Sequence, residues 1–104
     1  MSVLNMVETA MQFSQYRAAL LAGDAANASS AGFRPTDAAL AIEPAAGGLR
    51  FAAAMRDVES AGPVSTVEYA MGGIAKNSVW FRALASQAHA ILREFRTVAE
   101  EARR

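Results

Sequence analysis

The sequence predicts an all-α fold in which an N-terminal helix packs against a longer C-terminal helix, as in a coiled coil. Near both ends of the chain, apolar side chains recur every three or four residues, which is the spacing of one face of a helix. Between these segments, residues 28–64 hold all three prolines and a group of glycines and serines, which are typical of loops. The chain is 104 residues long, so we expect a single helical domain over residues 1–104.

The first helix is predicted over residues 2–27. No proline interrupts this segment, and its apolar and small side chains alternate three and four positions apart, with Arg17 as the charged exception. Gly23 and Asp24 offer a stop, since glycine is common just past a helix end, but the next residues contain no strong helix breaker, so the helix can continue to about Asn27. The large side chains of its apolar stripe are Val3, Met6, Phe13 and Leu20.

The middle of the chain, residues 28–64, is predicted to be a loop or linker that is mobile unless a partner orders it. Its prolines and glycines favour turns over long regular elements. Within it, the alanine-rich residues 49–58 favour a short helix of about two turns, which is only marginally stable alone in water.

The second helix is predicted over residues 65–103. Ser65 and Glu68 have the spacing of a capping box, in which each side chain accepts a hydrogen bond from a free backbone N–H at a helix start. A four-three spacing of apolar residues then continues for about five heptads. The large side chains of this stripe are Met71, Ile74, Phe81, Leu92 and Phe95.

The two predicted helices differ in length, and this difference has a consequence for assembly. The shorter helix covers only part of the longer one, so the stripe near Leu92 and Phe95 must be buried by something else. Each large apolar side chain left in water forfeits about 1.5–3 kcal/mol. We therefore expect the nine large side chains of the two stripes to form an assembly seam that is used in self-association or in a larger structure.

Composition argues against most chemical functions. Ten basic and ten acidic residues cancel, which gives no electrostatic reason to expect a nucleic-acid partner. Cysteine is absent, and the one histidine, His89, has no partners in a recognisable catalytic or metal-ligand spacing. We expect no catalytic, cofactor-binding or metal-binding residues, no cofactor and no small-molecule substrate. The protein is thus expected not to be an enzyme.

Membrane insertion and signal cleavage are also not expected. No apolar run reaches the ~18 residues of a transmembrane helix. The first 17 residues lack the basic region and the continuous apolar region of a cleaved secretory signal.

Two short segments carry a family resemblance. The segment of residues 25–33, Ala-Ala-Asn-Ala-Ser-Ser-Ala-Gly-Phe, resembles the Asn-x-x-Asn-x-x-Thr-x-Gly-Tyr pattern that follows the first helix of bacterial flagellar axial proteins. In this comparison Asn27, Gly32 and Phe33 take the places of the second asparagine, the glycine and the aromatic residue, and Asp24 stands where the first asparagine is expected. Residues 75–84, with Asn77, resemble the stretch that opens the long C-terminal helix of the proximal-rod subunit of the FlgB type.

We call Asn27, Gly32, Phe33 and Asn77 the signature positions. The resemblance implies a divergent member of the flagellar basal-body rod protein family. It implies a structural subunit that assembles by helix–helix packing into a helical tube, the proximal rod, which transmits torque. The implied partners are other copies of the chain and other rod and export-gate subunits. The implied location is the periplasmic rod of the flagellar basal body, reached by type III export without signal cleavage.

A second hypothesis from another class remains open. A small non-enzymatic helical-hairpin binding module, or a secreted helical protein of another secretion system, also explains the apolar stripes. It does not explain the signature positions. Concentration-dependent helix formation separates the two hypotheses, because a compact binding module melts cooperatively whatever its concentration.

Overall fold

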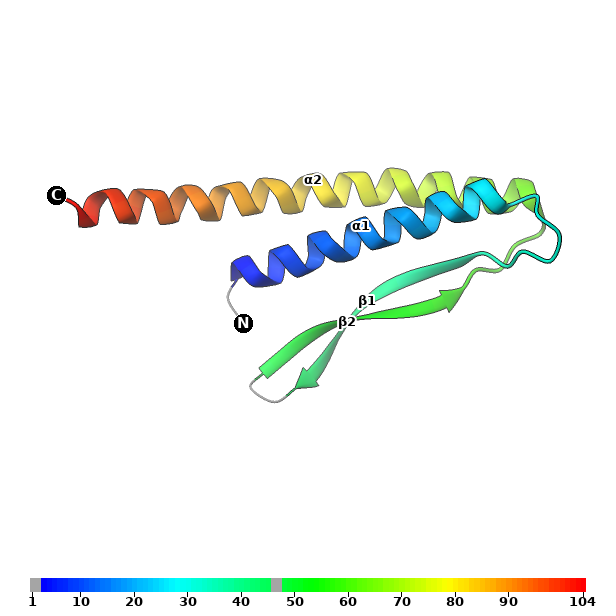
Figure 1. The fold of residues 1–104 in the computed structure, drawn as a ribbon, viewed down its shortest axis with the longest axis horizontal. Helices are drawn as coiled ribbons and strands as arrows, with labels where there is room; N and C mark the ends of the chain where they lie inside the picture. The colour runs from blue at the N-terminus through cyan, green and yellow to red at the C-terminus, as the bar shows by residue number, and fades with distance from the viewer. Residues whose placement is uncertain (1–2, 46–47) are drawn as a thin grey trace.

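The structure is a computed structural model that describes residues 3–45 and 48–104. Two helices run antiparallel, side by side, and a β-hairpin lies along one side of the pair (Figure 1). The chain order is α1 (Val3–Asn27), β1 (Thr36–Ala45), β2 (Gly48–Asp57) and α2 (Pro63–Ala102). The molecule is elongated, with extents of 65 × 30 × 14 Å.

The two predicted helices are confirmed, and their bounds agree closely with the expected ones. Residue 2, the expected first residue of the N-terminal helix, lies outside the described residues. The predicted capping box at Ser65 is wrong, because α2 begins two residues earlier. Its N-cap is Gly62, no side chain caps it, and Pro63 is the first helical residue. Proline suits that position, since the N–H that it lacks would have no partner inside the helix.

The expectation of an all-α fold with a loose middle region is corrected by a two-stranded antiparallel sheet. Strands β1 and β2 pair from Thr36 opposite Asp57 to Ala45 opposite Gly48. The short helix expected over residues 49–58 is therefore β2. Alanine favours a helix in isolation, but pairing with β1 satisfies the backbone of this segment, and tertiary context overrides propensity.

Small and polar side chains form most of the interface between the helices. A Cβ atom built on Gly73 would lie 2.9 Å from Leu21 Cδ1, so the helices approach closely at this point. The buried positions of the two helices are Val7, Ala10, Ser14, Leu21 and Asp24 in α1 and Thr66, Ala70, Gly73, Asn77 and Leu84 in α2. Most of these buried positions are one residue before or after a residue of the predicted stripes. One residue corresponds to a rotation of about 100° around a helix, so the buried face of each helix lies beside the predicted one.

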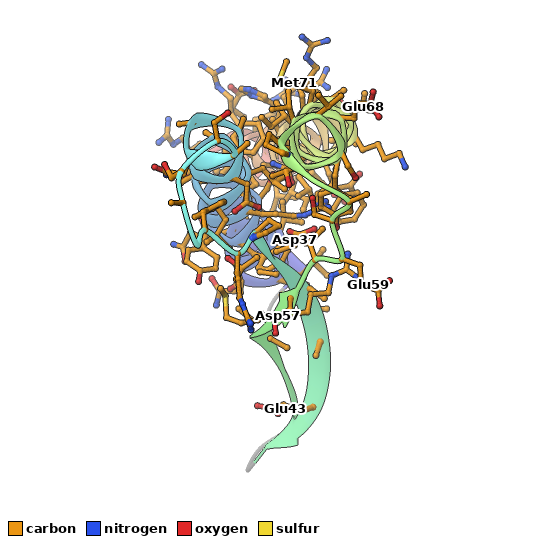
Figure 2. All side chains as sticks on the ribbon, turned by 90° about the vertical axis from the view of Figure 1, so that its right-hand side faces the viewer. Asp37, Glu43, Asp57, Glu59, Glu68 and Met71 are labelled. Carbon is orange, nitrogen blue, oxygen red and sulfur yellow. The ribbon has the colours of Figure 1, made fainter. Side chains whose placement is uncertain are left out.

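The hairpin contacts the helix pair through the first half of β1, at Asp37 and Leu40, and then diverges from the helices. Viewed along the helices, the pair lies at one side, and the hairpin curves away with Glu43 far from both helices (Figure 2). Leu40 of β1 packs against the apolar cluster formed by Val7, Ala10 and Leu84. The buried apolar side chains of the described residues are few, and half are alanines: Val7, Ala10, Leu21, Ala38, Ala70 and Leu84.

Candidate functional site

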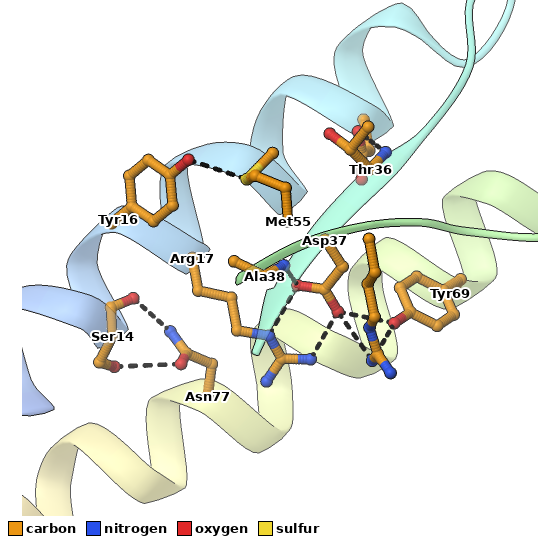
Figure 3. Close-up of polar contacts among 11 residues, drawn as sticks. Ser14, Tyr16, Arg17, Thr36, Asp37, Ala38, Met55, Tyr69 and Asn77 are labelled. Atoms are coloured by element: carbon orange, nitrogen blue, oxygen red, sulfur yellow. Dashed lines mark hydrogen bonds and ion pairs between the residues drawn. The ribbon is translucent and has the colours of Figure 1, made fainter. Parts of the chain in front are cut away.

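A buried carboxylate ties the hairpin to both helices. Asp37 on β1 is completely buried, and it accepts hydrogen bonds from Arg17 Nε at 2.9 Å and Arg17 Nη2 at 3.0 Å. Tyr69 on α2 donates its hydroxyl to Asp37 Oδ2 at 2.6 Å, and the Ala38 N–H donates to Oδ1 at 2.7 Å. Arg56 on β2 reaches Oδ2 at 3.4 Å. Figure 3 shows the Asp37 carboxylate between the Arg17 and Tyr69 side chains. We call Arg17, Asp37, Arg56 and Tyr69 the Asp37 cluster.

The Asp37 cluster is built to hold a negative charge. Burial by itself raises the pKa of Asp37, but the hydrogen bonds from Arg17 and Tyr69 outweigh it and hold this pKa well below its usual range. Burial, together with donation to the carboxylate, raises the pKa of Tyr69. Every partner stabilises the carboxylate and none is placed to exchange a proton near neutral pH, so the cluster is structural.

A second polar pair joins the helices directly. Ser14 Oγ donates to Asn77 Oδ1 at 3.1 Å, and Asn77 Nδ2 donates to the backbone carbonyl of Ser14 at 2.8 Å. Both side chains are buried. A reciprocal pair of this kind fixes the sliding position of one helix along the other, because a shift leaves buried polar groups unpaired.

The signature positions lie in two places rather than one. Asn77 lies in the middle of the helix interface, whereas Asn27, Gly32 and Phe33 lie at the exit from α1. The Asn27 side chain donates to the Gly23 carbonyl at 2.9 Å, and Gly32 has a φ of 73°, in the region that favours glycine. Phe33 is half-buried.

Asp24 is buried close to this exit, and only one of its oxygens has a partner. Its Oδ1 accepts the N–H of Thr36 at 3.2 Å, at the start of β1, while Oδ2 is buried without a hydrogen bond. Burial raises the pKa of Asp24. The side chain thus links the end of α1 to the hairpin at the expense of a poorly solvated charge.

The assembly seam predicted from the sequence is largely uncovered within the single chain. None of its nine side chains is buried: Val3, Met6, Met71, Leu92 and Phe95 are exposed, and Phe13, Leu20, Ile74 and Phe81 are half-buried. Met71, for example, lies on the side of α2 away from the hairpin (Figure 2). The side chains buried between the two helices lie at neighbouring positions, such as Ser14 and Leu21 beside Phe13 and Leu20.

An apolar groove lies at the open end of the molecule, where α2 continues past the beginning of α1 (Figure 1). Its volume is about 770 Å³. Phe95 and Val98 are 57% and 64% exposed. The side chains that line the groove are Val3, Leu4, Gln87, Ile91, Glu94, Phe95, Val98, Ala99 and Ala102. We take this groove as the candidate functional site, a surface shaped to receive an apolar face of another helix.

Other kinds of site are not found in the described part of the chain. Within residues 3–45 and 48–104, no group of three or more histidine, aspartate or glutamate side chains is placed to hold a metal ion. In the same residues, neither helix has an apolar stretch long enough to cross a bilayer. His89 is exposed on α2.

Sequence reasoning did not find the Asp37 cluster as a unit. Its clearest sequence signal was Arg17, a charged residue at a position where the helix pattern calls for an apolar one. Such a residue needs a buried partner of opposite charge, and Asp37 is that partner. Tyr69 offered no comparable signal, because an aromatic residue on a helix flank has many ordinary explanations.

The comparisons with known proteins leave the family of the chain open. No protein-family model matches the chain, and no curated protein or solved structure matches it.

Proposed function

We propose that the chain is a structural subunit of the flagellar basal-body proximal rod, which assembles with copies of itself and with other rod and export-gate subunits by helix packing. The observation that carries the assembly role is the uncovered apolar groove at the open end. Phe95 and Val98 of the groove are more than half exposed, which is costly unless a partner covers them. The assignment to the rod in particular rests on the signature positions.

The internal contacts support a subunit whose helices and hairpin keep one relative arrangement when the chain is folded. The Asp37 cluster and the Ser14–Asn77 pair fix the hairpin and the two helices relative to one another. The apolar residues that remain at the surface are then free for contacts between subunits. Contacts between unlike surfaces of identical subunits generate open helical arrays, the architecture that a rod requires.

Gene deletion tests the proposal in the bacterium that encodes the chain. We expect loss of the rod and of everything distal to it, with the membrane ring retained. Wild-type protein and an Ala90→Gln variant, changed at an exposed position that does not line the groove, should restore the rod. A Phe95→Gln variant should not, because it places a polar group in the groove. A deletion strain with complete, rotating flagella and no second copy of the gene would overturn the assignment.

The binding-module hypothesis remains the alternative, and the groove is compatible with it. An apolar groove beside a helix also suits a single amphipathic partner helix. Circular dichroism separates the two: a rod subunit should gain helix content with concentration, whereas a module that is complete on its own should melt cooperatively and independently of concentration.

A further inference from the structure

We propose that the end of α2 pairs in parallel with the same segment of a second copy of this chain, in a two-fold dimer with complementary charged edges. The segment is residues 92–103, which we call the overhang because α2 extends there beyond α1 (Figure 1). The inference goes beyond the proposed function and does not rest on it, because it follows from the side chains of this helix alone.

The overhang presents a continuous apolar line. Phe95 and Ala102 are seven residues apart and so point in nearly the same direction from a helix with 3.6 residues per turn. Leu92 and Val98 flank this line, and they are 51% and 64% exposed. Five apolar side chains form the face: Leu92, Phe95, Val98, Ala99 and Ala102.

Opposite charges border the line on its two sides. Glu94 and Glu101 each precede a residue of the line by one position, and Arg96 and Arg103 each follow one. One position is about 100° around the helix, so the two glutamates form one edge of the face and the two arginines form the other. All four side chains are exposed.

The contact that Arg96 makes within its own chain does not block this role. Arg96 Nε lies 3.7 Å from Glu100 Oε1, four residues along the helix, and both side chains are largely exposed. An exposed ion pair of this kind contributes little to stability. Arg96 can therefore exchange Glu100 for a carboxylate on a facing helix at little cost.

The arrangement of edges selects a direction of pairing. When two copies face each other in parallel, a two-fold axis runs along the helices and places the acidic edge of each copy opposite the basic edge of the other. In an antiparallel pair, acidic faces acidic and basic faces basic, which is unfavourable. A face with both edges is complementary to itself, so a second copy is the partner that it fits best.

Charge reversal tests the edges. Sedimentation equilibrium of the wild-type chain should show a monomer–dimer equilibrium that weakens as salt increases. The R96E/R103E variant has two acidic edges and the E94R/E101R variant two basic edges, so each alone should self-associate about tenfold more weakly or worse. An equimolar mixture of the two variants should recover the dimer. Circular dichroism checks that both variants keep their helices.

Single cysteines test the direction, since the natural chain has none. In a parallel dimer, Ala99→Cys and Ala102→Cys should each form a disulfide with the same residue of the partner copy under mild oxidation. In an antiparallel dimer, at most one of these two positions lies at the two-fold axis. Ala90→Cys, on the far side of the helix, serves as the control and should not cross-link.

Three results would overturn the inference. The first is a wild-type chain that stays monomeric at millimolar concentration in low salt. The second is self-association that the R96E/R103E change leaves intact. The third is cross-linking at only one of the two apolar positions. None of these results bears on the gene-deletion test, so the dimer and the rod assignment can fail separately.

Discussion

The part of α2 that packs against α1 and the overhang that extends beyond α1 are built from different side chains. The first part makes its contacts through Gly73, Asn77 and the Tyr69 hydroxyl, all of which have partners. The overhang presents Leu92 and Phe95 to the surface. In this chain, large apolar side chains thus lie mainly where no internal partner exists, and small or polar side chains make the internal fit.

This difference teaches how the apolar stripe should be interpreted. A four-three spacing shows that a helix has an apolar face, but it does not show which helix covers that face. Close approach at Gly73 and the fixed pair of Ser14 with Asn77 bring α1 to a neighbouring face of α2. The stripe with the larger side chains is left for other chains.

The largest effect on stability is expected at Asp37. Replacing Asp37 by Ala removes the shared acceptor and leaves Arg17 partly buried without its partner. We expect the free energy of unfolding to fall by about 3–5 kcal/mol, measured by urea denaturation. Glu43→Ala, at a position on β1 far from both helices, provides the comparison and should cost much less (Figure 2). Equal losses in the two variants would mean that the cluster is not what holds the hairpin.

A matched pair of glycines tests the close approach of the helices. A Cβ at Gly73 would lie 2.9 Å from the buried Leu21, whereas a Cβ at Gly72 has no atom within 4 Å. Gly72→Ala should stabilise the chain by up to about 1 kcal/mol through helix propensity. Gly73→Ala should be less stable than Gly72→Ala by about 1–3 kcal/mol because of overpacking. Thermal denaturation of both variants measures the difference, and similar melting temperatures would show that the helices are not in close contact.

The two buried aspartates should affect the pH dependence in opposite directions. The pKa of Asp37 is lowered by folding, so its stabilisation is present above the unfolded pKa of about 3.9 and is lost as pH falls through the folded pKa. The pKa of Asp24 is raised, so its contribution is full below the unfolded pKa and is lost as pH rises through the folded pKa.

Asp24→Asn should therefore stabilise the chain at pH 7, by about 1 kcal/mol, because it removes a poorly solvated charge and keeps an oxygen for the Thr36 N–H. The gain over wild type should shrink as pH falls toward 4. Urea denaturation at several pH values measures this difference in the free energy of unfolding. A variant that is less stable than wild type at pH 7 would indicate that the carboxylate has a partner in solution.

The smallest effect on stability is expected in the overhang. Phe95→Gln removes an exposed side chain, so the unfolding free energy of the monomer should change by less than about 0.5 kcal/mol. Self-association, measured by sedimentation at the same concentrations, should nevertheless weaken. This variant thus separates the role of the overhang in assembly from any role within the subunit. A large loss of monomer stability would place Phe95 in the subunit core.

The helices were predictable because their signals are long and local. An uninterrupted apolar period identifies α1 and α2 whatever they pack against. The hairpin was not predictable, because the alanine-rich run in residues 49–58 has the local preference of a helix. A Gly47-Gly48 dipeptide and opposite charges at Glu43 and Arg50, which face each other in the strand register, were the available signals.

The candidate site was predictable only in part. Exposure of Leu92 and Phe95 follows from the unequal helix lengths, which the sequence shows. The Asp37 cluster depends on contacts between residues up to 32 positions apart, such as Tyr69 with Asp37. Such contacts depend on how the hairpin packs on the helices. Because the sequence pattern did not predict the hairpin, these contacts could not be predicted either.

The pairing of β1 with β2 also has a consequence for the order of folding. Ser14 and Asn77 are 63 positions apart, so their contact requires closure of a long loop. Once Thr36 lies opposite Asp57, and Val58 donates to the Pro35 carbonyl at 3.1 Å, the hairpin has shortened that loop by about a third. Loop-closure entropy grows with loop length, and this shortening lowers its cost by about 0.4 kcal/mol. We therefore expect the hairpin to form before the helices dock, and the rate of folding to depend on the strand register more than on the overhang.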